Sequence, residues 1–224
     1  MKNKKIALCV LAKYPLVGNV KTRLAKKIDP KKAVKLYYEL LVNTIEQVKL
    51  AKVPHDIFIV SSDIENKNSL EFIFLNKADL VFYKEKSLAV LLLKIFEDFM
   101  SNKGYAKVLV TCSDSPFITP DLVLRAYCDL ENNNTLFISP SSDGGYSLVG
   151  LNKLIDIFSS VVMSTDKVLK DTIEVAKSHD LNICMSEIVD DIDNIQDVYR
   201  LNNKITDKHD PLGRVRREIE GIIK

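Results

Sequence analysis

Two cationic side chains and a hydroxyl lie together at Lys21, Thr22 and Arg23, in a loop that follows the first apolar run of the chain. Such a group can neutralise and hydrogen-bond a polyphosphate. The loop opens with Ala12 and Lys13, and it has neither the glycine and Gly-Lys order of a Walker A loop nor a GxGxxG pattern. The residues therefore predict a phosphate site of another kind, and a solvated, lysine-rich turn is the alternative.

A carboxylate, Asp114, follows a run rich in β-branched residues at 107–112 and precedes Pro116. At the carboxyl end of a strand it could bind a Mg²⁺ ion that bridges two phosphates, because Mg²⁺ favours one or two protein carboxylates together with phosphate oxygens. The alternative is an aspartate that closes a turn or caps the next helix.

A third candidate combines a carboxylate with paired glycines at Asp143, Gly144 and Gly145, followed by Tyr146. The glycines allow the backbone to approach a ligand closely, and Asp143 could bond a sugar hydroxyl or another acceptor. Asp-Gly and Gly-Gly are also the usual dipeptides of hairpin turns, so a plain turn is the alternative.

The fourth candidate is an acidic run that contains Asp190, Asp191 and Asp193 and ends at Asn194. Crowded carboxylates repel one another unless a cation or a helix N-terminus offsets their charge. The run predicts either a second metal contact or acceptor-activating base, or helix capping by Asp193 or Asn194.

The elements that would position these loops alternate along the whole chain. Apolar runs predict strands, and caps followed by apolar residues at helical spacing predict helices. This alternation predicts an α/β fold with a mainly parallel sheet and helices on both faces, in which ligands bind beyond the carboxyl ends of the strands. The predicted strands are 6–12, 56–61, 80–83, 107–112, 136–139, 146–151 and 183–188, and the predicted helices begin at Pro30, Ser87, Thr119 and Ser164 or Thr165, with a last one near 198–201.

No repeat and no linker rich in Gly, Pro or Ser divides the chain, so we expect one domain over residues 1–203. Residues 204–224 predict a basic, amphipathic C-terminal extension with apolar positions at Val215, Ile219, Ile222 and Ile223. This extension would dock on the body or on a second subunit, and it makes a homodimer possible.

Composition excludes several function classes. The formal charge of +2 comes from 32 Lys+Arg against 30 Asp+Glu, scattered along the chain, which argues against nucleic-acid binding. No apolar stretch approaches the ~20 residues of a membrane span. The four cysteines form no CxxC pair and nothing resembles a signal peptide, so we expect reduced thiols in a cytoplasmic protein.

Taken in order, these loops resemble the motifs of one family. That family is the GT-A-like transferases associated with radical-SAM, selenium-domain and arsenosugar gene clusters, which are usually described as glycosyltransferases. The likeness extends over about residues 5–202, and its motifs are 12–15 with 18–24, 113–120, 139–151, 164–169 and 191–193.

The resemblance implies the nucleotide-diphospho-sugar transferase fold (GT-A, Rossmann-like), a three-layer α/β/α sandwich with a mainly parallel, mixed sheet. Molybdenum-cofactor and phospholactate guanylyltransferases share this fold. It also implies a role for each loop: nucleotide and phosphate binding by Ala12, Lys13, Lys21, Thr22 and Arg23, metal binding by Asp114, Asp191 and Asp193, an acceptor side formed by Asp143, Gly144, Gly145 and Tyr146, and catalysis by Lys21, Asp114 and Asp143.

The function implied is transfer of a sugar from a nucleotide-diphosphate donor to a small-molecule acceptor, with Mg²⁺ or Mn²⁺ as cofactor. The alternative is a nucleotidyltransferase that acts on a nucleoside triphosphate and a phosphorylated acceptor. Where family members have a glycine-rich stretch, this chain has residues 85–89. A nucleotide-binding protein without catalysis is therefore the third interpretation.

Overall fold

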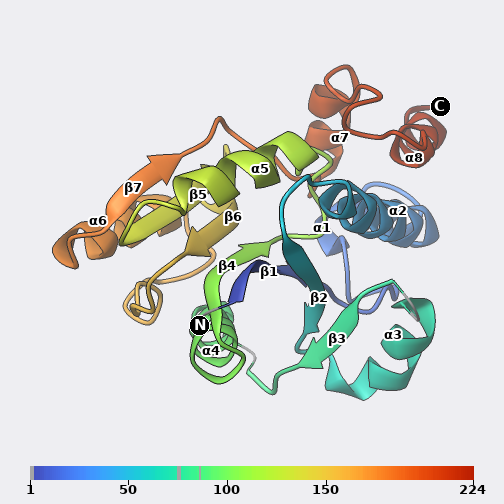
Figure 1. Ribbon diagram of the computed structural model, residues 1–224. Helices are drawn as coiled ribbons and strands as arrows, with labels where there is room; N and C mark the ends of the chain where they lie inside the picture. The colour runs from blue at the N-terminus through green and yellow to red at the C-terminus, as the bar shows by residue number, and fades with distance from the viewer. Residues whose placement is uncertain (1–2, 75–76, 86) are drawn as a thin grey trace.

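Seven strands form one sheet in the order β3-β2-β1-β4-β6-β5-β7 (Figure 1). This computed structural model describes residues 3–74, 77–85 and 87–224. The strands are β1 (Asn3–Leu11), β2 (His55–Ser61), β3 (Asp79–Phe82), β4 (Tyr105–Thr111), β5 (Thr135–Pro140), β6 (Tyr146–Leu151) and β7 (Asn182–Met185).

Most neighbouring strands are parallel. The exception is β6, which runs antiparallel to both β4 and β5. The predicted mainly parallel, mixed sheet is confirmed.

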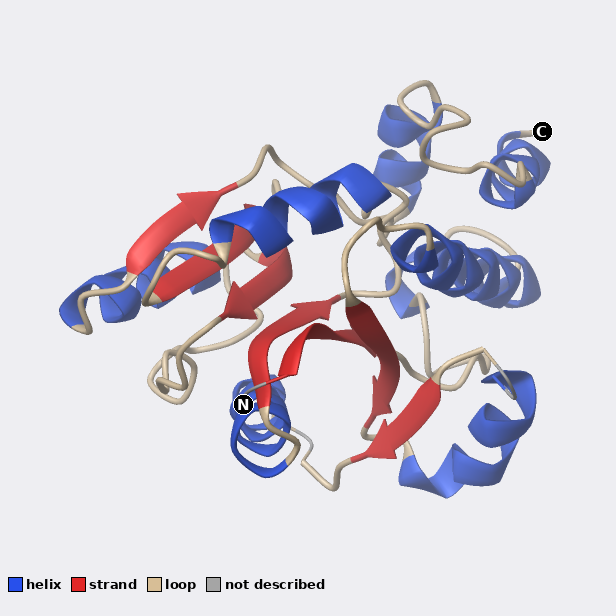
Figure 2. Cartoon of the chain, in the orientation of Figure 1, coloured by secondary structure: helices blue, strands red, loops and turns tan. Residues whose placement is uncertain are grey.

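Helices cover both faces of the sheet, which gives the predicted three layers (Figure 2). Side chains from α2, α3 and α5 pack on one face, and side chains from α4 and α6 pack on the other. The helices are α1 (Thr22–Ala25), α2 (Pro30–Lys49), α3 (Lys67–Phe74), α4 (Leu88–Glu97), α5 (Pro120–Asp129), α6 (Val168–Ser178), α7 (Ile195–Asn202) and α8 (Arg214–Ile223), with a short 3-10 turn at Ile64–Asn66 and a π-helical turn at Asp98–Asn102.

The central strand β1 shows why this sequence forms a three-layer fold. Ile6, Leu8 and Val10 point into the core under α2, whereas Ala7 and Cys9 point into the core under α4. Side chains alternate across a strand, so a run that is apolar at every position suits a strand covered on both faces.

Two helices begin with a side-chain cap followed by a proline. The Asp29 side chain accepts a hydrogen bond from the Lys31 backbone N–H at 2.8 Å, and Thr119 accepts one from Leu122 at 3.3 Å. Ser87 lies at the predicted N-cap of α4 but makes no side-chain capping bond.

Other predicted boundaries were wrong. Helix α6 begins at Val168 rather than at Ser164 or Thr165, and Ser164 adopts a left-handed backbone conformation with φ of 64°. Strand β7 ends at Met185, three residues before the predicted end. The sequence analysis also missed α3.

The order of the strands creates a crevice at β1. From β1 the chain passes to β2 and β3 on one side and returns to β4 on the other. Loops that follow β1 and β4 leave the sheet in different directions, and ligands of open α/β sheets bind at such switch points.

The C-terminal segment packs against its own chain. Val215 and Ile219 of α8 are buried in a cluster with Leu36 and Leu40 of α2, and Figure 1 shows α7 and α8 at one end of the molecule. These two apolar positions therefore give no argument for a homodimer. Among the described residues, no helix combines the length and apolar character needed to cross a bilayer.

Candidate functional site

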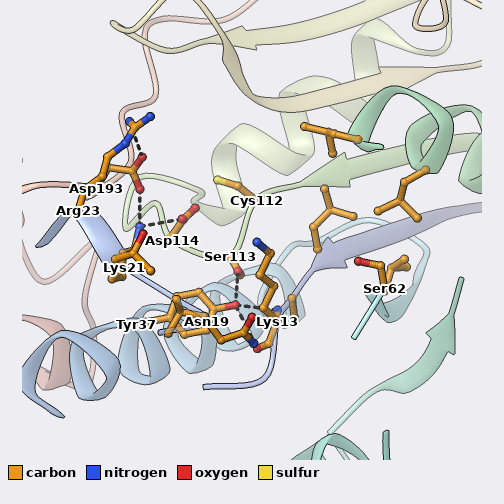
Figure 3. Close-up of a pocket in the computed structure, with 17 residues that line it drawn as sticks. Lys13, Asn19, Lys21, Arg23, Tyr37, Ser62, Cys112, Ser113, Asp114 and Asp193 are labelled. Carbon is orange, nitrogen blue, oxygen red and sulfur yellow. Dashed lines mark hydrogen bonds and ion pairs between the residues drawn. The ribbon is translucent and has the colours of Figure 1, made fainter. Parts of the chain in front are cut away.

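Lys21 lies at the centre of the crevice. Its Nζ atom is 2.8 Å from Asp114 Oδ2 and 2.8 Å from Asp193 Oδ1, and its side chain is only 2% exposed. Arg23 approaches the other oxygen of Asp193, with Nη1 at 3.6 Å from Oδ2 (Figure 3). Loops that follow β1 and β4 and the segment before α7 thus meet around one ammonium group.

The backbone at Lys21 is strained. Lys21 precedes α1 in the left-handed conformation, with φ of 47° and ψ of 39°. A non-glycine residue in this region costs about 1 kcal/mol or more, and such residues concentrate at functional sites. The conformation brings the Lys21 side chain into the crevice, while Thr22 remains exposed at its edge.

Successive side chains of the acidic run point to opposite sides of the chain, and this gives Asp190 a different environment from Asp191 and Asp193. Asp190 is buried, and its carboxylate accepts hydrogen bonds from the Ser142 backbone N–H at 2.9 Å and from Arg200 Nη1 at 2.7 Å. Asp191 and Asp193 project into the site instead. The cap of α7 is Asn194, in a capping box with Asp197, so Asp193 does not serve as the cap.

Asp114 likewise is not a helix cap, because Thr119 caps the following helix. Burial alone would raise the pKa of Asp114, but the Lys21 ammonium outweighs it and holds that pKa below its usual range. Burial would lower the pKa of Lys21, and Asp114 and Asp193 raise it instead. Lys21 is therefore a permanent cation in this site.

Asp191 has a different environment. Burial, together with the neighbouring carboxylates Asp114 and Asp193, raises its pKa to about 7. Lys21 offsets only part of this repulsion. The site thus has more negative charge than its own cations neutralise.

This donor set suits a hard divalent cation. Asp114, Asp191 and Asp193 each present one carboxylate oxygen within 4.8 Å of the others. Oxygen ligands are those that Mg²⁺ and Mn²⁺ prefer. A divalent ion would also relieve the repulsion that raises the pKa of Asp191, so the residues fit the predicted metal.

A cavity of about 400 Å³ lies beside Lys21. All five residues predicted to bind the nucleotide line it, and the rest of its lining includes several apolar side chains. The predicted residues in its lining are Ala12, Lys13, Lys21, Thr22 and Arg23, and the apolar ones include Leu11, Val60, Leu88 and Leu91.

Two residues that hold the first loop were missed in the sequence analysis. The Tyr37 hydroxyl accepts a hydrogen bond from the Lys13 backbone N–H at 2.9 Å and lies 3.2 Å from Ser113 Oγ (Figure 3). Asp63 accepts hydrogen bonds from the Tyr14 backbone N–H at 3.0 Å and the Asn19 amide at 2.8 Å. Asp63 follows β2, so the rule that drew attention to Asp114 applied there too.

A second cavity, of about 450 Å³, adjoins the first. Arg23, Leu88 and Asp193 line both. Asp143, Gly145 and Tyr146 line only the second cavity, together with Asp191. Three of the residues predicted for the acceptor side therefore line one cavity, and the residues predicted for the nucleotide line the other, with Arg23 shared by both.

The Asp143 segment is also a hairpin turn between β5 and β6. Asp143 Oδ1 accepts hydrogen bonds from Ser141 Oγ and from the Gly145 backbone N–H at 3.0 Å. Gly144 does not line the cavity. It has φ of +87°, and a Cβ built there would lie 2.1 Å from the Asp166 carbonyl oxygen.

The structure describes part of residues 85–89, which stand where family members have a glycine-rich stretch. Residue 86 lies outside the described residues, whereas Leu88 lies between the two cavities. An apolar side chain therefore contributes to the lining of both cavities at this point.

A family model described as "Uncharacterized protein conserved in bacteria (DUF2064)" matches residues 44–165, a range that includes Asp114 and the Asp143 turn. No curated protein matches the sequence significantly.

Solved structures share the fold. One, from Desulfovibrio desulfuricans G20 and provisionally assigned as a nucleotide-diphospho-sugar transferase, matches with a TM-score of 0.82 and 21% identity over 96% of this chain and 97% of that chain. The inositol-1-phosphate CTP transferase from T. maritima matches with a TM-score of 0.56 and 13% identity over 98% of each chain. The 4-diphosphocytidyl-2C-methyl-D-erythritol synthase from Anaerococcus prevotii DSM 20548 matches with a TM-score of 0.59 and 12% identity, over 89% of this chain and 95% of that chain.

Proposed function

This chain belongs to the family of uncharacterized proteins conserved in bacteria (DUF2064), and we propose that it is a metal-dependent transferase that moves a sugar from a nucleotide-diphosphate donor to a small-molecule acceptor. One observation carries the proposal. Lys21 and the three carboxylates lie where a cavity of nucleoside size meets a second cavity that could hold an acceptor.

The residues of the first cavity would bind the donor. Its apolar side chains would cover the nucleoside, while Lys13, Lys21 and Arg23 would surround the diphosphate. These cations would stabilise the charge that grows on the departing diphosphate, which is the usual electrostatic route of such catalysis. Lys21 is buried, and its ammonium already lies in the crevice, where two ion pairs hold it.

Asp114, Asp191 and Asp193 would hold Mg²⁺ or Mn²⁺, which neutralises the diphosphate when bound. Asp143 lies on the acceptor side, where its carboxylate could accept a proton or a hydrogen bond from the attacking hydroxyl.

A thermal-shift screen tests donor binding. Sugar nucleotides with Mg²⁺ or Mn²⁺ should raise the melting temperature, because a ligand that binds only the native state stabilises it. A Lys21→Met variant should lose most of the rise that the sugar nucleotide adds to that of the metal alone. If no sugar nucleotide of the panel raised the melting temperature, the proposal would be contradicted. Release of a nucleoside diphosphate in the presence of an acceptor would establish turnover.

Nucleotidyl transfer is the second candidate, and the likeness to two cytidylyl-transferring enzymes favours it. The same cations and carboxylates would then act on the α-phosphate of a nucleoside triphosphate. Pyrophosphate release distinguishes the two reactions, because glycosyl transfer produces none.

A further inference from the structure

The second cavity has acidic walls. Among the described side chains that line it, one is a cation and four are carboxylates: Arg23 against Asp143, Asp166, Asp191 and Asp193. In the first cavity the described cations outnumber the carboxylates: Lys13, Lys21 and Arg23 against Asp114 and Asp193. Positive charge therefore lies on the side proposed for the diphosphate, and the acceptor side is negative.

A bound divalent ion would not cancel this acidity. It would neutralise Asp191 and Asp193 together with Asp114, the set whose oxygens lie within 4.8 Å of one another. Asp143 and Asp166 lie outside that set, and both line the acceptor cavity.

These two carboxylates are held on adjoining segments. The Leu169 backbone N–H donates to the Gly144 carbonyl at 2.9 Å, and the Asp166 backbone packs so closely on Gly144 that a Cβ there would clash with it. The hairpin turn and the segment before α6 thus form one wall. A small shift of either would move both acidic groups together.

Arg23 is poorly placed to receive an acceptor phosphate. Its guanidinium lies 3.6 Å from Asp193, its side chain is 75% exposed, and it lines the donor cavity too. An anionic acceptor would have to share this one cation with the donor diphosphate.

The remaining polar groups suit a neutral ligand. Hydroxyls of Ser141, Ser164 and Thr165 belong to the cavity wall, and carboxylates accept hydrogen bonds from ligand hydroxyls. Among the described residues, Asp143 Oδ2 accepts no hydrogen bond, since both turn bonds reach Oδ1.

We propose that the acceptor is an uncharged, polyhydroxylated molecule and that Asp143 and Asp166 exclude its phosphate esters. The inference rests on the proposed function, and it names the acceptor class of that same site. It favours sugar transfer to a hydroxyl over nucleotidyl transfer to a phosphorylated acceptor.

The test uses the full chain saturated with Mg²⁺ and with the nucleoside diphosphate that raises its melting temperature most. Matched probes are glucose, myo-inositol and glycerol, each with its own phosphate ester, and binding is followed by ligand-detected NMR. At least one neutral probe should bind, about tenfold or more tightly than its ester, because like charges in an interface oppose binding strongly.

A charge-neutral variant makes the assignment specific. Asp166→Asn should reduce the preference for the neutral probe by about threefold or more, while Asp79→Asn, at an exposed position of β3, should leave it unchanged. An Asp166→Asn preference equal to that of the wild type would overturn the role of Asp166.

Other outcomes also decide the question. Tighter binding of the esters, or no binding by any neutral probe, overturns the inference while nucleotide binding still supports a transferase. Glucosamine bound much more tightly than glucose would overturn it in favour of a cationic acceptor. Absence of any nucleotide binding removes the proposed function itself, and this inference with it.

Discussion

Lys21 Nζ lies 2.8 Å from Asp193 Oδ1, although 172 positions separate the two residues in the chain. The same ammonium pairs with Asp114, so it connects the loops that follow β1 and β4 with the segment before α7. The side chains of Asp114 and Asp193 are 23% and 38% exposed, so both carboxylates are partly buried. Loss of Lys21 should therefore affect both stability and binding.

We expect Lys21→Met to lower the free energy of unfolding by about 2 kcal/mol, because it leaves partly buried carboxylates unpaired. Nucleotide binding should weaken by about tenfold or more, since a charge-assisted contact to phosphate is lost. Denaturant unfolding and calorimetric titration measure the two effects. The exposed control Lys177→Met should change neither, and an equal effect of both variants would contradict the role given to Lys21.

Mn²⁺ should stabilise the Lys21→Met variant more than the wild type. In the wild type the Lys21 ammonium already contacts Asp114 and Asp193, and a metal ion alone must compete with it. The measurement is the rise in melting temperature on adding Mn²⁺ without nucleotide. A larger rise in the wild type would show that Lys21 does not compete for these oxygens.

Asp191→Asn should weaken Mn²⁺ binding by about tenfold or more, because a neutral amide replaces one of three carboxylate ligands. Electron paramagnetic resonance of free Mn²⁺ reports the affinity without any need for turnover. Asp79→Asn is the matched control, and it should bind Mn²⁺ like the wild type.

Gly144→Ala should disrupt the acceptor side. A Cβ at this position meets the Asp166 carbonyl at 2.1 Å, and the backbone has φ of +87°. Gly104→Ala separates the two causes, since Gly104 also has positive φ but nothing within 4 Å of a new Cβ. We expect Gly144→Ala to lose more stability than Gly104→Ala, by about 1 kcal/mol or more, and equal losses in thermal unfolding would contradict the packing argument.

Asp63→Asn should loosen the first loop and lower the free energy of unfolding by about 1–3 kcal/mol at neutral pH, because an amide cannot accept all the hydrogen bonds of the carboxylate. Burial would raise the pKa of Asp63, but hydrogen bonds from Asn66, Tyr14 and Asn19 lower it below 3.8. The wild-type carboxylate therefore contributes fully above 3.8 and loses its contribution as the pH falls through the lowered pKa. Unfolding curves of the two proteins should converge in this acidic range, and a difference independent of pH would contradict the assignment.

Asp210→Ala should destabilise the C-terminal segment. The buried Asp210 carboxylate accepts hydrogen bonds from the Arg214 backbone N–H at 3.0 Å and the Arg216 backbone N–H at 2.8 Å. Hydrogen exchange of α8 should accelerate, while α4, on the opposite face of the sheet, should keep its protection. Unchanged exchange in α8 would show that the packing of Val215 and Ile219 alone holds the helix.

Patterns in the sequence were enough to predict the layers and the loops that meet at the site. The reason is that apolar runs and capping pairs such as Thr119–Pro120 report local backbone preferences, and parallel strands bring their carboxyl ends to one edge. Asp114 could thus be placed near Lys21 before any contact was known, whereas for Asp193 the residues alone left helix capping open, and the family resemblance implied its place in the site.

Details that depend on tertiary packing were not accessible in this way. Tyr37 has the spacing of a core residue, and only the folded chain shows its hydroxyl on the Lys13 backbone. Helix α6 starts later than Ser164 because the preceding segment packs against Gly144. The separate roles of Asp190 and Asp191 likewise depend on which side of the chain faces the crevice.

The opposite orientations of Asp190 and Asp191 limit how the length of this segment can vary between related proteins. Asp190 and Ile192 face inward, and Asp191 and Asp193 face the crevice, so deletion of a single residue here would turn each side chain to the opposite side. Length changes in this segment should abolish function even where the acidic composition is kept.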